Sequence, residues 1–160
     1  MADKKFTGKT AIVTGAGQGI GFEMASQLGA SGANVILNDL DPVFANAAAG
    51  RIRDETKSRC IAMAGDSGGL DFIQRMVSGA VSEFGGLDIV IANAGITLFG
   101  DFLTYPPESF FRVLQVNLGG TFFLAQAAAN QMIKQGSGGS LLFTSSVTGH
   151  QAHKNLAAYG

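Results

Sequence analysis

Glycines crowd the segment from Thr14 to Gly21, which reads TGAGQGIG. Glycine lets a backbone come close to a pyrophosphate, and a helix that starts there adds free N–H groups and the positive end of its dipole. An apolar run over Thr10–Val13 precedes the turn and a helical pattern over Ile20–Leu28 follows it, which favours a phosphate site over an ordinary tight turn. The residues expected at the phosphates are Gly15, Gly17, Gln18, Gly19, Ile20 and Gly21.

Asp39 ends a second apolar run, 24 positions after Gly15. A carboxylate at this point can accept hydrogen bonds from the ribose hydroxyls of adenosine. It would also repel a 2′-phosphate, whose charge is about −2. No Lys or Arg stands at positions 38, 40 or 41, and position 18 is Gln. We therefore predict NAD rather than NADP as the cofactor, with an ordinary turn carboxylate as the alternative for Asp39.

Short apolar runs alternate with helical segments along the chain. Strands are predicted at Thr10–Val13, Val35–Leu37, Cys60–Met63, Leu87–Ala92 and Leu141–Ser145, and helices at Ile20–Leu28, from Pro42 to about Lys57, at Leu70–Phe84 and within Pro107–Gln135. This alternation indicates βαβ units, whose right-handed crossovers give a doubly wound parallel sheet, the Rossmann fold of the α/β class. We predict one NAD-binding domain over residues 1–160.

The long helix predicted within Pro107–Gln135 is apolar on more than one side. Phe111, Leu118 and Phe122 fall on one stripe, and Val113 and Leu124 fall on another. A helix that is apolar all round is either buried on all sides or shared with a partner. Burial under neighbouring elements and a subunit interface are both open at this point.

The glycine pattern is T-G-x-x-x-G-I-G, not G-x-G-x-x-G, because Ile20 stands where the third glycine would be. In this the chain resembles the short-chain dehydrogenase/reductase family, and the resemblance runs from near its start to its last residue. Asn93-Ala94-Gly95, after the fourth predicted strand, matches the family's N-A-G motif. The resemblance implies that Asn93 braces the sheet by hydrogen bonds and that Gly95 lets the cofactor approach.

Asp66 ends the third predicted strand, where the family has an acidic residue that contacts the adenine amino group. The residue after it is usually aliphatic in the family, but here it is Ser67. The resemblance implies an adenine contact for Asp66, with a solvated turn residue as the alternative.

Three further residues match the family's active site. Ser146 follows the fifth predicted strand, and Tyr159 lies 13 positions later, which is the family's usual spacing and favours Ser146 over Ser145. Asn117 matches the active-site Asn within the long helix. The resemblance implies that Tyr159 moves the proton, Ser146 holds the substrate oxygen and Asn117 anchors a water in the proton path. A hydride would pass between NAD(H) and an alcohol or carbonyl carbon.

This mechanism requires a cation beside the tyrosine. The ordinary pKa of a tyrosine phenol is about 10, which is too high for a base near neutrality. The oxidised nicotinamide ring supplies one positive charge, and the family adds a Lys four residues after the Tyr. That Lys would stand at position 163, whereas the sequence ends at Gly160. We therefore expect a longer natural chain, with the last strands of the usual fold and the helix that begins at the Tyr missing here.

Composition excludes several other classes of protein. The net charge is −1 with no basic block, so nucleic acid is not an expected partner. A single cysteine, Cys60, rules out a disulfide within the chain, and we expect a cytoplasmic protein that is not membrane-bound. His150 and His153 are three positions apart but have no Cys or acidic partner nearby, so loop histidines are favoured and no metal site is predicted.

The leading hypothesis is an NAD(H)-dependent oxidoreductase acting on a secondary alcohol, with sugars, polyols, steroids and acyl thioesters all open as substrates. One alternative is a non-catalytic NAD-binding module, and a Lys at position 163 would favour the enzyme over it. Another alternative is an assembly subunit that binds no cofactor. The family resemblance also implies a homo-oligomer, namely a tetramer.

Overall fold

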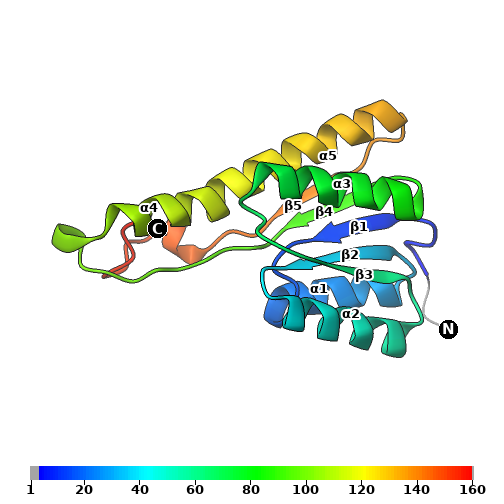
Figure 1. The fold of residues 1–160 in the computed structure, drawn as a ribbon, viewed down its shortest axis with the longest axis horizontal. Coiled ribbons are helices and arrows are strands. Elements are labelled where there is room, and N and C mark those ends of the chain that lie inside the picture. The colour runs from blue at the N-terminus through cyan, green and yellow to red at the C-terminus, as the bar shows by residue number, and fades with distance from the viewer. Residues whose placement is uncertain (1–3, 160) are drawn as a thin grey trace.

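Five parallel strands form one sheet in the computed structural model, which describes residues 4–159 (Figure 1). The strands are β1 (Thr10–Val13), β2 (Asn34–Asp39), β3 (Cys60–Ala64), β4 (Ile89–Ala92) and β5 (Ser140–Phe143). Their order across the sheet is β3-β2-β1-β4-β5, and every neighbouring pair is parallel. The chain winds outward from β1 in both directions, so the predicted doubly wound α/β Rossmann fold is confirmed.

Helices cover both faces of the sheet (Figure 1). Helices α1 (Gly19–Ala30) and α2 (Pro42–Thr56) lie on one face, whereas α3 (Leu70–Phe84) and α5 (Thr121–Gln135) lie on the other. Alternate strand residues feed the two cores, because successive side chains of a strand point to opposite faces. Val13 packs with α1 and α2, and Ile12 packs with α3 and α5.

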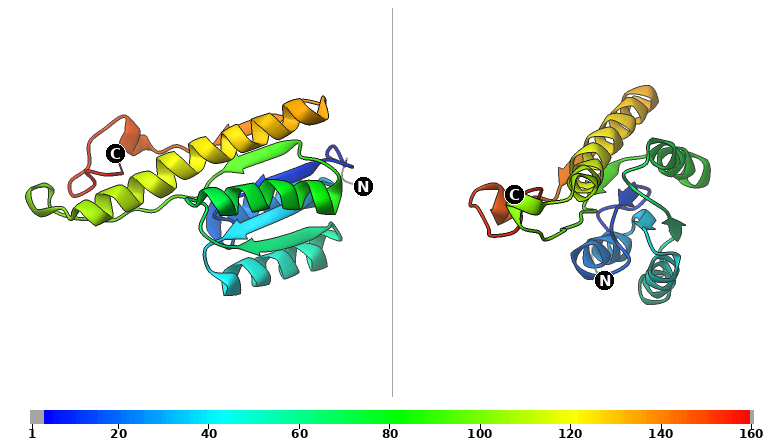
Figure 2. Two further views of the ribbon diagram at one scale, coloured as in Figure 1. Left: turned by 45° about the horizontal axis from the view of Figure 1, so that its top comes forward. Right: turned by 60° about the vertical axis from the view of Figure 1, so that its left-hand side comes forward.

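The long helix predicted within Pro107–Gln135 is present and is built from three consecutive segments. They are α4 (Pro107–Leu114), the π-helix η2 (Gln115–Gly120) and α5. Together they extend past the carboxyl ends of the strands as an arm, and the chain after β5 returns beside α4 (Figure 2). Two short 3₁₀ turns complete the structure, η1 (Phe102–Thr104) and η3 (Val147–Gly149).

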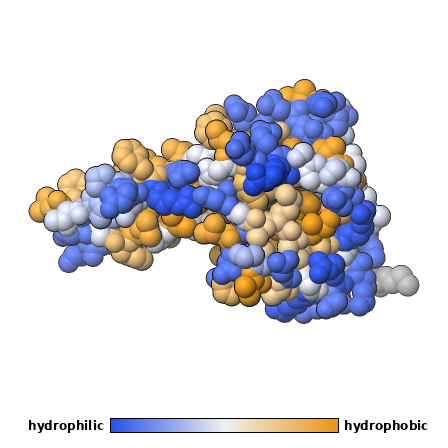
Figure 3. All heavy atoms as spheres, in the orientation of Figure 1, coloured by the Kyte–Doolittle hydropathy of each residue, from blue (hydrophilic) through white to orange (hydrophobic). Residues whose placement is uncertain are grey.

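The two apolar stripes of this helix have different surroundings. Val113 and Leu124 are buried, whereas Phe111, Leu118 and Phe122 are each more than half exposed. Apolar side chains accordingly lie open along the arm in the space-filling view (Figure 3). Neighbouring elements therefore bury one stripe and, within residues 4–159, leave the other uncovered.

Several strand boundaries differ from the prediction: β2 is longer at both ends, β3 ends one residue later at Ala64, and β5 begins at Ser140. β4 begins at Ile89 instead of Leu87, because the backbone N–H and C=O of Leu87 bond to the side-chain amide of Gln135 at 3.1 and 2.6 Å. β5 ends at Phe143, two residues before Ser145. Side-chain bonds thus replace strand pairing at Leu87, whereas the backbone of Asp88 already bonds to Thr10 and Ser140.

Cys60 is buried at the start of β3, and burial raises the pKa of its thiol to about 12. The thiol therefore stays protonated near neutrality and packs as a small apolar group. Over residues 4–159, no helix is both long and apolar enough to cross a bilayer.

Candidate active site and cofactor site

The turn between β1 and α1 leaves no room for side chains on its inner side. A Cβ on Gly15 would lie 2.8 Å from the Cα of Ala94, and one on Gly21 would collide with the carbonyl oxygen of Gly15. Gly19 has a φ of +61°, and a Cβ added to it would meet nothing within 4 Å, so this side of the turn is open. The predicted glycines therefore fold the turn tightly and keep its outer side free for a ligand.

Helix α1 starts at this open side. Its N-cap, Gln18, makes no side-chain capping hydrogen bond, and no acidic residue lies in the first turn. Gln18 and Ile20 are exposed at the same end, Ile20 to 71%. The first N–H groups and the positive end of the helix dipole are thus available to an anion.

Asp39 is held at the C-terminal end of β2 by two backbone N–H groups. Gly17 donates to its Oδ2 at 2.9 Å, and Asp41 donates to its Oδ1 at 3.1 Å. A Cβ on Gly17 would lie 2.7 Å from the same Oδ2, so turn and carboxylate are in close contact. A carboxylate has about four lone-pair positions, so Asp39 keeps acceptor capacity for ribose hydroxyls.

Asn93 ties the ends of three strands together. Its Nδ2 donates to the carbonyls of Thr14 and Gly15, both at 3.1 Å, and its Oδ1 accepts from the hydroxyl of Thr144 at 3.0 Å. Thr14 Oγ1 in turn accepts from the N–H groups of Asn93 and Ala94 at 3.0 and 3.1 Å. This is the geometry expected of a brace. Sequence reasoning did not select the two threonines, because a lone Thr at a strand end gives no distinct signal.

Asp66 lies in the loop after β3. Its Oδ1 accepts from the N–H of Gly68 at 2.8 Å, and its Oδ2 accepts from Arg112 Nη1 at 2.7 Å. Arg112 is on α4, 46 positions away in sequence, and was not among the predicted site residues. The hydrogen bond from Arg112 is the largest cause that lowers the pKa of Asp66, aided by Gly68 and opposed by burial.

These residues surround a cavity of about 160 Å³ at the carboxyl ends of the strands. It is lined by Gly15, Asn38, Asp39, Leu40, Asp66, Ser67, Ala94, Gly95, Ile96, Arg112 and Val116. The predicted ribose and adenine residues therefore line the same cavity, at the sheet edge where open α/β folds bind ligands.

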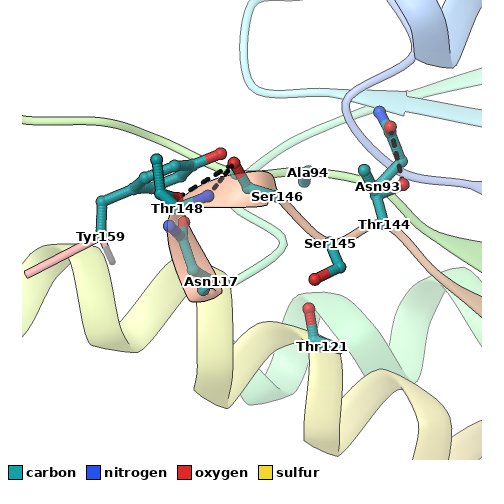
Figure 4. A pocket seen from close by; sticks show the side chains of 11 residues that line it. Asn93, Ala94, Asn117, Thr121, Thr144, Ser145, Ser146, Thr148 and Tyr159 are labelled. Carbon is teal, nitrogen blue, oxygen red and sulfur yellow. Dashed lines mark hydrogen bonds between the residues drawn. The ribbon is translucent and has the colours of Figure 1, made fainter. Parts of the chain in front are cut away.

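A second cavity, of about 200 Å³, brings together Asn117, Ser146 and Tyr159 (Figure 4). The three residues come from η2, from the start of η3 and from the chain just before Gly160. This cavity and the first one share Ala94 and Gly95 as lining residues. The two hollows are thus contiguous, as an extended dinucleotide with a substrate at one end would require.

Ser146 is oriented by its neighbour Thr148. Its Oγ accepts from the Thr148 N–H at 3.3 Å and from the Thr148 hydroxyl at 3.0 Å. With both lone pairs engaged, the Ser146 hydroxyl is left to donate. Tyr159 points its ring toward Ser146, whereas Ser145 points toward Thr121 (Figure 4). The arrangement favours Ser146 over Ser145, and Thr148 is a polar contributor that the sequence prediction did not include.

The amide of Asn117 makes one hydrogen bond as acceptor and one as donor, both to Ile96. Its Oδ1 accepts from the N–H of Ile96 at 2.8 Å, and its Nδ2 donates to the Ile96 carbonyl at 2.9 Å. The side chain therefore fixes the loop after β4 against η2, and a π-helical segment of this kind often accompanies a functional site. One N–H of Nδ2 and one lone pair of Oδ1 are left over for the water of the sequence prediction.

His150 and His153 line a third cavity next to η3, which shares Thr148 and Gly149 with the second one. Among the residues that the structure describes, no group of three or more His, Cys, Asp or Glu side chains is placed to hold a metal ion.

A family model for short chain dehydrogenases matches residues 9–160. A short-chain dehydrogenase/reductase of Armillaria gallica is 40% identical over 95% of this chain and 59% of its own length. The L-rhamnose-1-dehydrogenase of Scheffersomyces stipitis is 35% identical over 91% of this chain and 60% of its own. The crystal structure of an NAD⁺-bound xylitol dehydrogenase superposes with a TM-score of 0.91 at 32% identity, covering 98% of this chain and 60% of that one. The chain thus spans about 60% of the length of these relatives.

Proposed function

The chain belongs to the short-chain dehydrogenase/reductase family, and from that premise we propose that it binds NAD(H) and serves a hydride transfer between a secondary alcohol and the corresponding carbonyl. The observation that carries the proposal is the meeting of Asn117, Ser146 and Tyr159 around one cavity. That cavity adjoins the hollow that holds Asp39 and Asp66. The proposed chemistry and the proposed cofactor binding would thus lie side by side on the sheet edge.

The residues present fit a dinucleotide. The glycine turn excludes side chains on its inner side and is open at Gly19, next to the free N-terminus of α1, where the pyrophosphate would bind. Asp39 would accept from the adenosine ribose. Gly95 would border the nicotinamide end, where a Cβ added to it would lie 3.6 Å from Asn117 Oδ1. When bound, the nicotinamide ring accepts or donates the hydride.

The protein's own groups would handle the oxygen and the proton. Ser146 would donate its hydroxyl hydrogen to the substrate oxygen, because Thr148 already occupies its acceptor positions. Tyr159 would take the proton from an alcohol, or return it to a carbonyl oxygen, as a general base or acid. Asn117 would hold the loop at Ile96 so that this edge of the cavity keeps its shape.

The substrate class stays broad. L-rhamnose 1-dehydrogenases and diacetyl reductases are among the relatives, at 33–38% identity, and they differ widely in substrate. Sugars, polyols, steroids and acyl thioesters all remain within the proposal. A non-catalytic NAD-binding module is the second candidate.

The two candidates are separated by following NADH absorbance while the full-length protein is given NAD and a panel of sugars, polyols and other secondary alcohols. The enzyme produces NADH with at least one member of the panel. The binding module would be favoured if calorimetry shows that NAD binds while no alcohol yields NADH and no carbonyl consumes it. Failure to bind NAD at all would remove both candidates.

We predict that NAD binds at least about tenfold more tightly than NADP, which corresponds to about 1.4 kcal/mol. The cause is the carboxylate of Asp39, which accepts from ribose hydroxyls and repels a 2′-phosphate. Asp39→Ala should reduce the difference between the two affinities, mainly by weakening the binding of NAD, in titrations followed by cofactor fluorescence or heat. Asp54→Ala, the same charge change on the exposed side of α2, is the control and should leave both affinities unchanged. Equal affinities in the unaltered protein, or a preference for NADP, would contradict the prediction.

We also propose a homo-oligomer, specifically a tetramer, that covers the exposed stripe of the arm. Phe111, Leu118 and Phe122 are 66%, 64% and 57% exposed, and contiguous exposed apolar surface marks association sites. Light scattering of the full-length protein at micromolar concentration should give a mass well above that of a monomer. Phe122→Glu should lower the mass, whereas Val43→Glu, at another exposed apolar residue on α2, should not. A monomer before any substitution would refute the proposal.

A further inference from the structure

An ion pair joins α4 to the loop after β3 at the wall of the first cavity. Arg112 Nη1 lies 2.7 Å from Asp66 Oδ2, and the two side chains are 33% and 37% exposed. Both residues line the cavity that contains Asp39. The proposed cofactor site thus includes a cation that no glycine or strand-end motif of the sequence indicates.

The carboxylate of Asp66 is fixed at both oxygens. Oδ1 accepts from the N–H of Gly68 at 2.8 Å, so the two contacts together leave the group little freedom to rotate. The bond from Arg112 lowers the pKa of Asp66 more than any other contact. An ionised carboxylate only accepts hydrogen bonds, and it retains lone pairs beyond the two already used. Asp66 is therefore held as a pure acceptor.

The loop that carries Asp66 is also clamped as a whole. Gln115 accepts from Arg112 Nη1 at 3.2 Å and donates to the carbonyl of Gly68 at 3.4 Å. A Cβ on Gly120 would lie 2.7 Å from the carbonyl oxygen of Ser67, so η2 touches the loop backbone directly. Of these contacts, the one from Arg112 brings a positive charge to the carboxylate.

We propose that Arg112 is a positioning residue for base recognition: by holding the carboxylate of Asp66 in place as the acceptor for the 6-amino group of adenine, it makes the site prefer adenine over hypoxanthine. This inference rests on the proposed function, namely that the hollow binds the adenosine half of NAD(H).

The physical basis is the direction of one hydrogen bond. Adenine carries an amino group at position 6, which donates to a carboxylate. Hypoxanthine carries a carbonyl oxygen there, so two acceptors would face each other and the carboxylate would lose a partner, which costs free energy. Without Arg112, Asp66 loses the contact that fixes its Oδ2 and turns more freely, so the acceptor is no longer held opposite position 6 of the base. Discrimination between the two bases should then shrink.

The test compares binding of NAD and of nicotinamide hypoxanthine dinucleotide to the full-length protein by calorimetry at pH 7. We expect the unaltered protein to bind NAD at least about tenfold more tightly, or about 1.4 kcal/mol. In Arg112→Ala the ratio should fall below about threefold, chiefly because NAD binds more weakly. Arg112→Lys should keep part of the ratio, since a lysine can still donate to the carboxylate. Arg51→Ala, which breaks the Arg51–Glu55 pair of equal length on the surface of α2, should leave the ratio unchanged.

If Arg112 had a merely structural role, or stacked its guanidinium on the base, Arg112→Ala would lower the affinity for both dinucleotides equally. That result would overturn the inference. So would an unaltered protein that binds NAD without discriminating, which would leave the proposed NAD site intact. An unaltered protein that binds neither dinucleotide would instead refute the proposed function. If Arg112→Ala fails to fold, Arg112→Lys provides the test. A positioning role would be contradicted if the ratio of the two affinities in Arg112→Lys equals that of the unaltered protein. It would also be contradicted if both dinucleotides lose affinity equally.

Discussion

Turnover by the full-length protein should fall by about 10²–10⁴-fold when Tyr159 is replaced by phenylalanine, the range expected for losing a general acid or base. Binding of NAD should change little, because the ring that remains still fills its place in the cavity with Asn117 and Ser146. Steady-state rates with the best alcohol of the panel, and calorimetric titration of NAD, measure the two effects separately. The split between rate and binding is what a proton-transfer role predicts.

Tyr105→Phe is the matched control, because the sequence contains two tyrosines. The Tyr105 hydroxyl donates to the carbonyl of Leu98 at 2.6 Å, in the loop before η1. Its loss should leave the rate nearly unchanged. Ser146→Ala should also impair turnover strongly, whereas Ser145→Ala should not. Full activity of Tyr159→Phe would remove this residue from the mechanism, and the reverse order of the two serines would show that the other hydroxyl holds the substrate.

Gly21→Ala should weaken NAD binding by at least about tenfold, or about 1.4 kcal/mol. The added methyl group would collide with the carbonyl of Gly15 and lie 2.6 Å from Asn93 Nδ2. Backbone and brace would have to move together, and overpacking of this kind costs about 1–3 kcal/mol of unfolding free energy. Calorimetric titration of NAD gives the first effect, and chemical denaturation of the same samples gives the second.

Gly50→Ala makes the same chemical change inside α2. There the nearest atom to the added Cβ is 3.8 Å away, on Arg53, which is an ordinary contact. Alanine in a helix interior is favoured over glycine by about 0.5–1 kcal/mol. This variant should therefore bind NAD normally and unfold at a slightly higher temperature. Normal NAD binding by Gly21→Ala would mean that the turn relaxes at little cost and that its close packing does not shape the site.

Elements whose ends are encoded locally were predictable from the sequence. Helix α3 ends where Gly85 adopts a φ of 87°, and α2 begins at Pro42 behind an Asp41 cap that accepts from the N–H of Val43. Both signals lie within a few residues of the boundary. The start of β4 was not predictable in this way, because Gln135 decides it from 48 positions away.

The same contrast holds for the site. Position within a motif was enough to select the glycine turn, Asn93 and the serine–tyrosine spacing, although their roles in the complete protein stay predictions. Arg112 was missed because its partner is 46 positions away and only the folded topology brings them together. Thr148 had a local signal, since a hydroxyl two residues after Ser146 can bond back to it, but this pattern is common in turns.

The π-helix η2 also sets the rotation of one half of the long helix relative to the other. Its hydrogen bonds close over five residues instead of four, so it holds more chain than an α-helical path would need. Loss of a single residue there, such as Gly119, would therefore restore an unbroken α-helix with α4 and α5 in nearly their present relative rotation. Loss of a residue from α4 or α5 would instead turn one half of the long helix by about 100° relative to the other, since an α-helix has about 3.6 residues per turn. In a homologous chain, a one-residue length change within η2 would therefore act on Asn117 and the substrate cavity, and it would leave Arg112 facing Asp66.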